Sequence, residues 1–335
     1  MAIGILGAGS WGWTLAHIIL KRERSNNNDK IFIWTRDEKV SKSINEHGVN
    51  PKRFPDFPIY NGRVYATTSL EEVFSNCEII LVAVSVSSVR EVIRSASRFI
   101  EGNHIIVSTS KGFEKNTGKR VSEIIKEESC CRKIGVLSGP NLAREILEGS
   151  PSAAVVASNI REVQEKVYSA MHSPLFRIYT SYDVVGVELG GALKNIYAIA
   201  AGIADGLGFK VNSLAFLLSR AASEMMRLGV MFGAKRETFF GISGIGDLFA
   251  TASSDLSRNR RFGKLLVAGK KPEEALKEIG EVVEGYWTTH VAFSMSVELG
   301  IKLNIVSTLY KIIFLGYDIP NAIRELLHAE VKEEF

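Results

Sequence analysis

Short apolar runs alternate with helix-like stretches through the first half of the chain. The runs that we predict to be strands are 2–6, 30–34, 78–84, 104–109, 134–138 and 153–157. They are apolar on both faces and helical patterns separate them, which is typical of a parallel sheet covered by helices on both sides. The first half is therefore predicted to be a doubly wound, Rossmann-type α/β domain. The proline-rich stretch 48–62 is predicted to be a surface loop, and whether it closes over a ligand is left open.

The pattern changes near residue 184. Helical periodicity dominates from there to the end, with helices expected over 186–205, 213–232 and 262–268. We therefore expect a dinucleotide-binding domain over 1–183 and a mainly α-helical substrate-binding and catalytic domain over 184–335. The apolar helices of the second domain would suit a homodimer interface or simply its own core.

Composition narrows the classes of function. The 41 basic and 37 acidic residues give a formal net charge of +4, too small to indicate a nucleic-acid partner. Cys77, Cys130 and Cys131 fit neither a disulfide framework nor the spacing of metal ligands, so reduced thiols, a cytoplasmic location and no metal are expected.

No targeting or membrane-spanning segment is expected. The first residues already have the pattern of a buried strand. The most apolar stretch, 196–204, ends at Asp205, well short of the about 18 apolar residues of a spanning helix.

A glycine fingerprint follows the first predicted strand. Gly7, Gly9, Ser10, Trp11 and Gly12 lie in the string GAGSWG, which opens the first predicted helix. The first glycine permits a tight turn, the second lets the backbone approach a pyrophosphate, and the third lets the helix pack close to the strand. This placement predicts an NAD(P) site, with a ligand-free glycine turn as the alternative.

The second strand ends in an arginine rather than an acid. Arg36 comes first and Asp37 follows, whereas an NAD-specific unit often places Asp or Glu at this point. A guanidinium there suits the 2′-phosphate of NADP, so NADP(H) is expected to be tolerated or preferred. The alternative is a solvated loop arginine.

Two further strands run directly into polar residues. Lys111 follows the strand at 104–109, and Asn141 follows the strand at 134–138. Ligands of such folds lie outside the carboxyl ends of the strands, so Lys111 is expected to meet a phosphate or a carbonyl.

The second domain carries two charges in apolar surroundings. Lys194 lies within GGALKNIYAIAAG, and Asp247 lies within GISGIGDLFAT. A buried ammonium needs a partner or a lowered pKa, and either suits a proton donor to a carbonyl oxygen. We expect Asp247 to be that partner. The alternatives are a lysine at a helix edge that extends to water and an aspartate that caps a helix.

A basic run precedes a helical stretch at residue 262. Ser257 or Asn259 would cap that helix, and its start together with Arg258 would bind a phosphate dianion. The alternative is a basic, solvated face.

Together these segments resemble the NAD-dependent glycerol-3-phosphate dehydrogenase family, particularly its bacterial members. The matching strings, in order over residues 7–288, are GAGSWG, STSKGFE, LSGPNLARE, VELGGALKNIYAIAAGIADGLGF, GISGIGDLFAT, SRNRRFG and VVEGYWT. The combination is specific, although no single string is.

The resemblance implies residue roles. The residues implied to contact the dinucleotide are Ser10, Trp11, Arg36, Lys111, Ala143, Arg258, Val282 and Glu284. Those implied to contact the substrate are Lys111, Gly139, Asn141, Lys194, Asp247, Ser257, Arg258 and Asn259. Lys194 matches the proton acceptor, and Asn195 and Thr251 match polar residues that line the active site.

The chain departs from the family pattern at two places. Asn141 stands where many bacterial members carry Thr or Ser, and its amide is expected to donate to the substrate instead. Trp13 and Thr14 replace small residues, and Trp13 is expected to crowd the packing of helix on sheet.

The implied reaction interconverts dihydroxyacetone phosphate and sn-glycerol 3-phosphate with NAD(P)H, supplying glycerol 3-phosphate for phospholipid synthesis. Lys194 is expected to protonate the C2 oxygen, with Asp247 orienting it and Lys111 balancing charge. One alternative is a related hydroxyacid or sugar-acid dehydrogenase, which would bind a substrate carboxylate. Another is a dinucleotide-binding redox sensor without turnover, which does not explain Lys194, Asp247 and the arginine run together.

Overall fold

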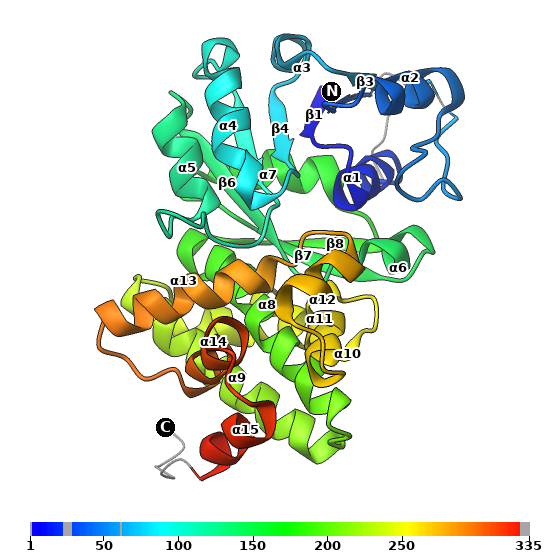
Figure 1. Cartoon of the computed structure of the whole chain (residues 1–335). Helices are drawn as coiled ribbons and strands as arrows, with labels where there is room; N and C mark the ends of the chain where they lie inside the picture. The colour runs from blue at the N-terminus through cyan, green and yellow to red at the C-terminus, as the bar shows by residue number, and fades with distance from the viewer. Residues whose placement is uncertain (1, 23–28, 61, 329–335) are drawn as a thin grey trace.

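The computed structural model describes residues 2–22, 29–60 and 62–328. Figure 1 shows two parts stacked on one another, a sheet with helices on both faces and a bundle of helices. The chain passes from the first part to the second at helix α8 (Val184–Gly206), which runs through the middle of the bundle.

Eight strands form one sheet in the order β3-β2-β1-β4-β5-β6-β7-β8. The strands are β1 (Ala2–Leu6), β2 (Lys30–Trp34), β3 (Val64–Thr67), β4 (Ile79–Val82), β5 (Ile105–Ser108), β6 (Lys133–Ser138), β7 (Ser152–Ala157) and β8 (Phe176–Ser181). All neighbours pair parallel except β6 and β7, which pair antiparallel. The first six strands have the doubly wound order of a dinucleotide-binding unit.

The six predicted strands are confirmed, and two edge strands were not predicted. In β3 and β8 buried residues alternate with exposed or half-buried ones, so these strands lack the continuous apolar run that marks the strands between them. The expected parallel direction is wrong for the β6–β7 pair. Because β7 runs back along β6, the connection at 139–151 stays at the carboxyl edge of β6.

Helices cover both faces of the sheet. They are α1 (Ser10–Leu20), α2 (Glu38–His47), α3 (Leu70–Asn76), α4 (Val86–Ala96), α5 (Val121–Glu128), α6 (Ala143–Leu147) and α7 (Arg161–Met171), with a short 3₁₀ turn η1 (Ser97–Phe99). Alternate strand residues face opposite cores: Ile5 packs on one face and Leu6 on the other. This two-sided burial explains why the central strands read as continuous apolar runs.

The second part is helical, as predicted. After α8 come α9 (Val211–Met231), the 3₁₀ turn η2 (Arg236–Phe240), the π-helical turn η3 (Ile242–Gly246), α10 (Asp247–Ser253), α11 (Arg258–Val267), α12 (Pro272–Ile279), α13 (Glu284–Glu298), α14 (Asn304–Leu315) and α15 (Ile319–Leu327). Asp183 caps the start of α8 by accepting a hydrogen bond from the Gly186 N–H at 2.9 Å.

Helix α8 is the centre of the helical core. It has 23 residues, and every residue from Gly186 to Ile203 is buried. By length and composition alone it would cross a membrane, but 89% of its most apolar window is buried inside the protein. Its apolar character is therefore that of a core helix.

Two glycines let α8 and α11 cross at close range. A Cβ added to Gly202 would lie 2.0 Å from the carbonyl oxygen of Arg260, and one added to Gly263 would lie 2.2 Å from the carbonyl oxygen of Ile199. Backbone therefore meets backbone at this crossing, and any side chain would push the helices apart.

We predict that Gly202→Ala lowers the free energy of unfolding by about 1–3 kcal/mol, the usual cost of overpacking. Urea unfolding followed by circular dichroism measures it. The control is Gly102→Ala, in an exposed turn where an added Cβ meets nothing within 4 Å. Equal stability of the two variants would contradict the role of the crossing.

Candidate active site

The glycine fingerprint has the geometry of a phosphate cradle. Gly7 has φ 121°, a conformation that favours glycine, and a Cβ on Gly12 would lie 1.8 Å from the Gly7 carbonyl oxygen. A Cβ on Gly9 would meet nothing within 4 Å, so the space beside it is open. No side chain caps α1, which leaves the first N–H groups of this helix for a ligand. These features fit the pyrophosphate of a dinucleotide.

The loop at 48–60 lies against this cradle. Asn50 Nδ2 donates to the Ala8 carbonyl oxygen at 2.9 Å, and Trp13 Nε1 donates to the Phe57 carbonyl oxygen at 3.0 Å. The Trp13 side chain is fully buried. Trp13 therefore anchors the loop, and its ring packs in the core between α1 and the sheet.

A buried carboxylate joins two lysines from different parts of the chain. Asp247, 1% exposed, accepts from Lys194 Nζ at 2.6 Å through Oδ1 and from Lys111 Nζ at 2.6 Å through Oδ2. Lys194 Nζ also donates to Thr251 Oγ1 at 2.6 Å, and Lys111 Nζ donates to the Gly139 carbonyl oxygen at 2.7 Å. An ammonium has three N–H donors, so each lysine retains one donor beyond these contacts.

The environment of Lys194 favours proton transfer. The pKa of Lys194 is lowered to about 8. Burial is the largest cause; Asp247 opposes it, and the nearby charges of Lys111 and Arg258 act in the same direction as burial. Lys194 is 8% exposed in the middle of α8, so the alternative of a lysine reaching out to water is wrong. Asp247 is the first residue of α10 and forms no helix cap, so that alternative is also wrong.

Glycines place these groups within reach of one another. A Cβ on Gly190 would lie 2.5 Å from the Ser243 carbonyl oxygen in the π-helical turn, and one on Gly191 would lie 2.3 Å from Ser138 Oγ. Helix α8 therefore packs directly on the turn that precedes Asp247 and on the end of β6. Turns of this kind are often found at functional sites.

A second set of contacts joins α8, α11 and α13. Asn259 Nδ2 donates to Asn195 Oδ1 at 2.9 Å, and Asn259 Oδ1 accepts from the Gly285 N–H at 2.9 Å. Asn195 Nδ2 donates to the Lys111 carbonyl oxygen at 3.4 Å, which connects this set to the lysine pair. Ser257 caps α11 by accepting from the Arg260 N–H at 3.3 Å, as one of the two predicted caps.

Arg258 and Glu284 lie beside this set. Arg258 Nη1 pairs with Glu281 at 3.1 Å, and Glu281 also pairs with Arg53 of the loop at 3.2 Å. Glu284 Oε1 accepts from the Val86 N–H at 3.4 Å, and burial raises the pKa of Glu284 to about 7. The Arg53–Glu281 and Glu284–Val86 contacts cross from the helical part to the sheet part.

Unpartnered polar atoms flank Gly139. Ser138 Oγ and Asn141 Oδ1 are buried and have no hydrogen-bond partner among the described residues. Asn141 Nδ2 already donates to the Ala153 carbonyl oxygen at 3.0 Å, so its free atom is an acceptor rather than the expected donor. Polar atoms left without a partner beside the lysines fit a site that receives a polar ligand.

The structure joins the predicted catalytic residues and several predicted substrate residues by hydrogen bonds, and it leaves some predicted cofactor residues outside these contacts. Lys111, Gly139, Lys194, Asn195, Asp247, Thr251 and Asn259 form the contacts described above. Arg36 and Val282 are exposed, and Ala143 begins the short helix α6. Ser138, Arg53 and Glu281 were missed. Ser138 precedes Gly139 at a strand end, which is a usable signal, whereas nothing in the sequence pairs Arg53 with Glu281.

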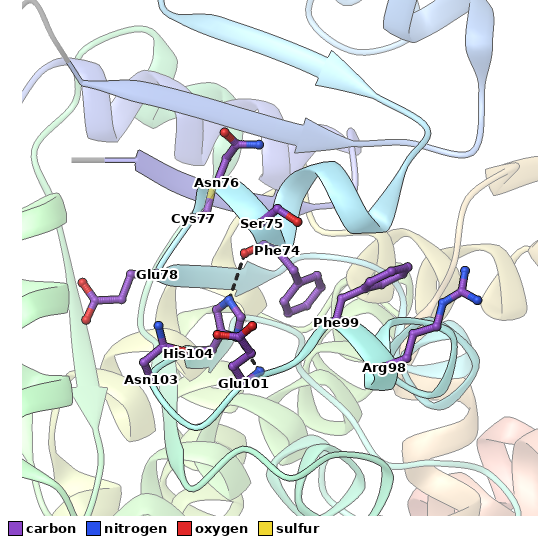
Figure 2. A pocket seen from close by; sticks show the side chains of 10 residues that line it. All are labelled: Phe74, Ser75, Asn76, Cys77, Glu78, Arg98, Phe99, Glu101, Asn103 and His104. Atoms are coloured by element: carbon purple, nitrogen blue, oxygen red, sulfur yellow. Dashed lines mark hydrogen bonds between the residues drawn. The ribbon is translucent and has the colours of Figure 1, made fainter.

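A separate hollow lies at the opposite edge of the sheet. It measures ≈ 330 Å³ and is lined by residues before β4 and before β5, as Figure 2 shows. Its histidine, His104, accepts from the Glu101 N–H at 2.7 Å and contacts the Phe74 carbonyl oxygen at 2.9 Å, so both ring nitrogens are used. This hollow is at the amino ends of the strands, away from the ligand edge.

Comparison with known proteins identifies the family. The model of the NAD-dependent glycerol-3-phosphate dehydrogenase N-terminus matches residues 2–164, and that of the C-terminus matches residues 183–324. The glycerol-3-phosphate dehydrogenase [NAD(P)+] of Halothermothrix orenii is 43% identical over 99% of this chain and 96% of its own length. One from a Thermoanaerobacter species is also 43% identical, over 100% of this chain and 99% of its own.

Solved structures agree. A glycerol-3-phosphate dehydrogenase from Coxiella burnetii superimposes with a TM-score of 0.90 at 33% identity, covering 98% of each chain. A ketopantoate reductase from Ralstonia eutropha superimposes with a TM-score of only 0.60 at 12% identity, which shows the shared fold alone. Neither the hydroxyacid dehydrogenase alternative nor the sensor alternative gains support from these likenesses. Since both family models match and together span nearly all of it, the chain belongs to the NAD-dependent glycerol-3-phosphate dehydrogenase family.

Proposed function

We propose that the protein catalyses dihydroxyacetone phosphate + NAD(P)H + H⁺ ⇌ sn-glycerol 3-phosphate + NAD(P)⁺. The observation that carries this proposal is the buried carboxylate of Asp247 held between Lys194 and Lys111, near Arg258. Lys111 follows β5 at the same carboxyl edge of the sheet at which the glycine cradle follows β1. The bound cofactor supplies or accepts the hydride at C2.

Lys194 is the general acid in this proposal. Its remaining N–H donates to the C2 oxygen of dihydroxyacetone phosphate, and the proton passes to that oxygen as the C2 carbonyl is reduced. In the reverse direction the neutral amine takes the proton from the C2 hydroxyl. Asp247 and Thr251 orient Lys194, since they accept its two other hydrogen bonds.

Lys111 stabilises charge at the same oxygen. Its ammonium shares Asp247 with Lys194 and is held by the Gly139 carbonyl oxygen, so its free N–H is fixed in direction. A cation fixed in advance lowers the cost of the negative charge that develops on the C2 oxygen.

The substrate phosphate is assigned to the start of α11. Arg258 and the Asn259 amide lie in the first turn of this ten-residue helix, where a cation, an amide and the helix dipole favour an anion. Ser257 holds that turn in place as its cap. Gly139, Asn141, Asn195 and Thr251 complete the proposed substrate set.

The dinucleotide is assigned to the carboxyl edge of the sheet, where the two parts meet. Gly7, Gly9 and Gly12 form the proposed cradle, and the other residues assigned to the cofactor are Ser10, Trp11, Arg36, Lys111, Ala143, Arg258, Val282 and Glu284. Accordingly, residues 1–183 would bind the dinucleotide and residues 184–335 the substrate.

We further propose a cytoplasmic homodimer that supplies glycerol 3-phosphate for phospholipid synthesis. Cys77, Cys130 and Cys131 are free thiols, which suits a reducing compartment. Phe209, Phe216 and Val211 at the α8–α9 corner are 41%, 60% and 79% exposed and would be covered in a dimer. Light scattering of the purified protein tests the dimer.

Lys194→Ala is expected to lower kcat for dihydroxyacetone phosphate reduction by about two to four powers of ten, the range for loss of a general acid. Steady-state oxidation of NADH and of NADPH measures it. The control is Lys302→Ala, an exposed lysine of the same domain. A folded Lys194→Ala enzyme with unchanged turnover would refute the role.

The rate of dihydroxyacetone phosphate reduction should fall with rising pH, whereas the rate of glycerol 3-phosphate oxidation should rise. Reduction needs the ammonium form of Lys194, whose pKa is about 8, so kcat/KM should fall about tenfold per pH unit above that value. Oxidation needs the amine form and should rise with pH up to the same point. Initial rates from pH 6 to pH 10 measure both; a reduction rate that stays level to pH 10 excludes Lys194 as the acid.

Arg258→Ala is expected to raise KM for dihydroxyacetone phosphate by about ten- to a hundredfold, because a charge-assisted contact to phosphate is lost. The matched control is Arg261→Ala, an exposed arginine on the same helix. An unaltered KM, or an equal rise in the control, would count against the phosphate assignment.

A further inference from the structure

A hollow opens at the carboxyl end of β2. It measures ≈ 510 Å³ and is lined by Arg36, Asp37, Glu38, Lys39 and Lys52. The first four follow β2 directly, whereas Lys52 comes from the loop at 48–60. In a Rossmann-type unit the end of the second strand meets the adenosine ribose of the dinucleotide. The hollow is therefore where this chain would distinguish the 2′-hydroxyl of NAD from the 2′-phosphate of NADP.

Asp37, one of the two acidic residues that line this hollow, already has hydrogen-bond partners for both carboxylate oxygens. Asp37 Oδ1 accepts from the Lys39 N–H at 2.9 Å and the Val40 N–H at 3.3 Å and thereby caps α2, while Oδ2 pairs with Lys52 Nζ. The hydrogen bond from Lys52 lowers the pKa of Asp37 below its ordinary value, so the carboxylate is charged at neutral pH. A bare carboxylate here would bind ribose hydroxyls and repel a phosphate.

The guanidinium of Arg36 is accessible. It lies over the Trp34 ring, 5.8 Å from the centroid, and pairs at 3.2 Å with Glu91. The side chains of this pair are 53% and 72% exposed, and exposed pairs of this kind are weak. A phosphate dianion, which accepts two parallel hydrogen bonds from a guanidinium, would replace Glu91.

Hydrogen bonds of Asn50 hold the loop so that Lys52 lies at the hollow. Asn50 Nδ2 holds the loop on the fingerprint through the Ala8 carbonyl oxygen. Asn50 Oδ1 accepts from the N–H groups of Lys52 and Arg53, at 3.2 and 3.1 Å, which turns the chain there. One side chain thus fixes both the loop on the cofactor cradle and the position of Lys52.

We propose that Lys52 determines the cofactor preference: by neutralising Asp37, it allows Arg36 to bind the 2′-phosphate of NADP(H) in this hollow. The inference rests on the proposed function, because it assigns the adenosine end of the same dinucleotide. With Lys52 present, the lining of the hollow carries three cationic and two anionic side chains: Arg36, Lys39 and Lys52 against Asp37 and Glu38. Without Lys52 the two kinds of charge are equal in number, and one oxygen of Asp37 faces the phosphate unpaired.

The test compares binding of adenosine 2′,5′-bisphosphate with that of adenosine 5′-monophosphate to the full chain, by titration calorimetry at one ionic strength. The unmodified protein should bind the bisphosphate more tightly. Lys52→Met should reduce this preference about tenfold, because an unscreened carboxylate repels the second phosphate. The matched control, Lys42→Met, removes an exposed lysine of α2 that pairs with Glu46 outside the hollow, and should leave the preference as it was.

A double variant tests the mechanism. Asp37→Asn combined with Lys52→Met removes the repelling charge and keeps an amide oxygen to cap α2, so the preference for the bisphosphate should return. Recovery supports neutralisation of Asp37 by Lys52. No effect of Lys52→Met, an equal effect of Lys42→Met, or no recovery in the double variant would each overturn it.

Turnover separates this inference from the function on which it rests. The ratio of kcat/KM with NADPH to that with NADH, measured on dihydroxyacetone phosphate, should follow the binding preference through the same variants. If dihydroxyacetone phosphate is reduced with neither cofactor, the proposed function fails, while the binding measurements still decide the role of Lys52.

Discussion

The arrangement of this molecule depends on one carboxylate shared by two ammonium groups. Asp247 is almost fully buried, and a buried charge without a partner is costly, as are two neighbouring cations without an anion between them. Because Lys111 belongs to the sheet part, whereas Lys194 and Asp247 belong to the helical part, satisfying these charges also fixes how the two parts meet. The chemistry and the domain interface therefore share one set of contacts.

Glycines make this contact set possible. Helix α8 approaches the end of β6 through Gly191, the π-helical turn through Gly190 and α11 through Gly202. At each point a methyl group would meet a backbone or hydroxyl oxygen, so the helix lies closer to its neighbours than ordinary side chains permit. Several glycines in an otherwise apolar helix, which would weaken it in isolation, are explained by these approaches.

The sequence predicts those features of the structure that depend on the residues of a single segment. The central strands are apolar on both faces, and the partnership of Lys194 with Asp247 follows because each is a lone charge in apolar surroundings. Edge strands β3 and β8 alternate buried and exposed residues and were missed, and the reversed direction of β7 leaves no mark in its own residues. The pairs Arg53–Glu281 and Lys52–Asp37 join ordinary surface charges on different elements, and no local pattern links them, so only the fold reveals them.

The burial of α8 on all sides affects how fast its amide hydrogens exchange with solvent and how readily proteases cut it. A helix surrounded on all sides opens only when the structure around it unfolds, so its amide hydrogens report the global stability rather than local fluctuation. A protease that clips exposed loops leaves this segment intact. The amine that carries the proposed proton transfer therefore lies on a helix that keeps its structure as long as the surrounding fold does.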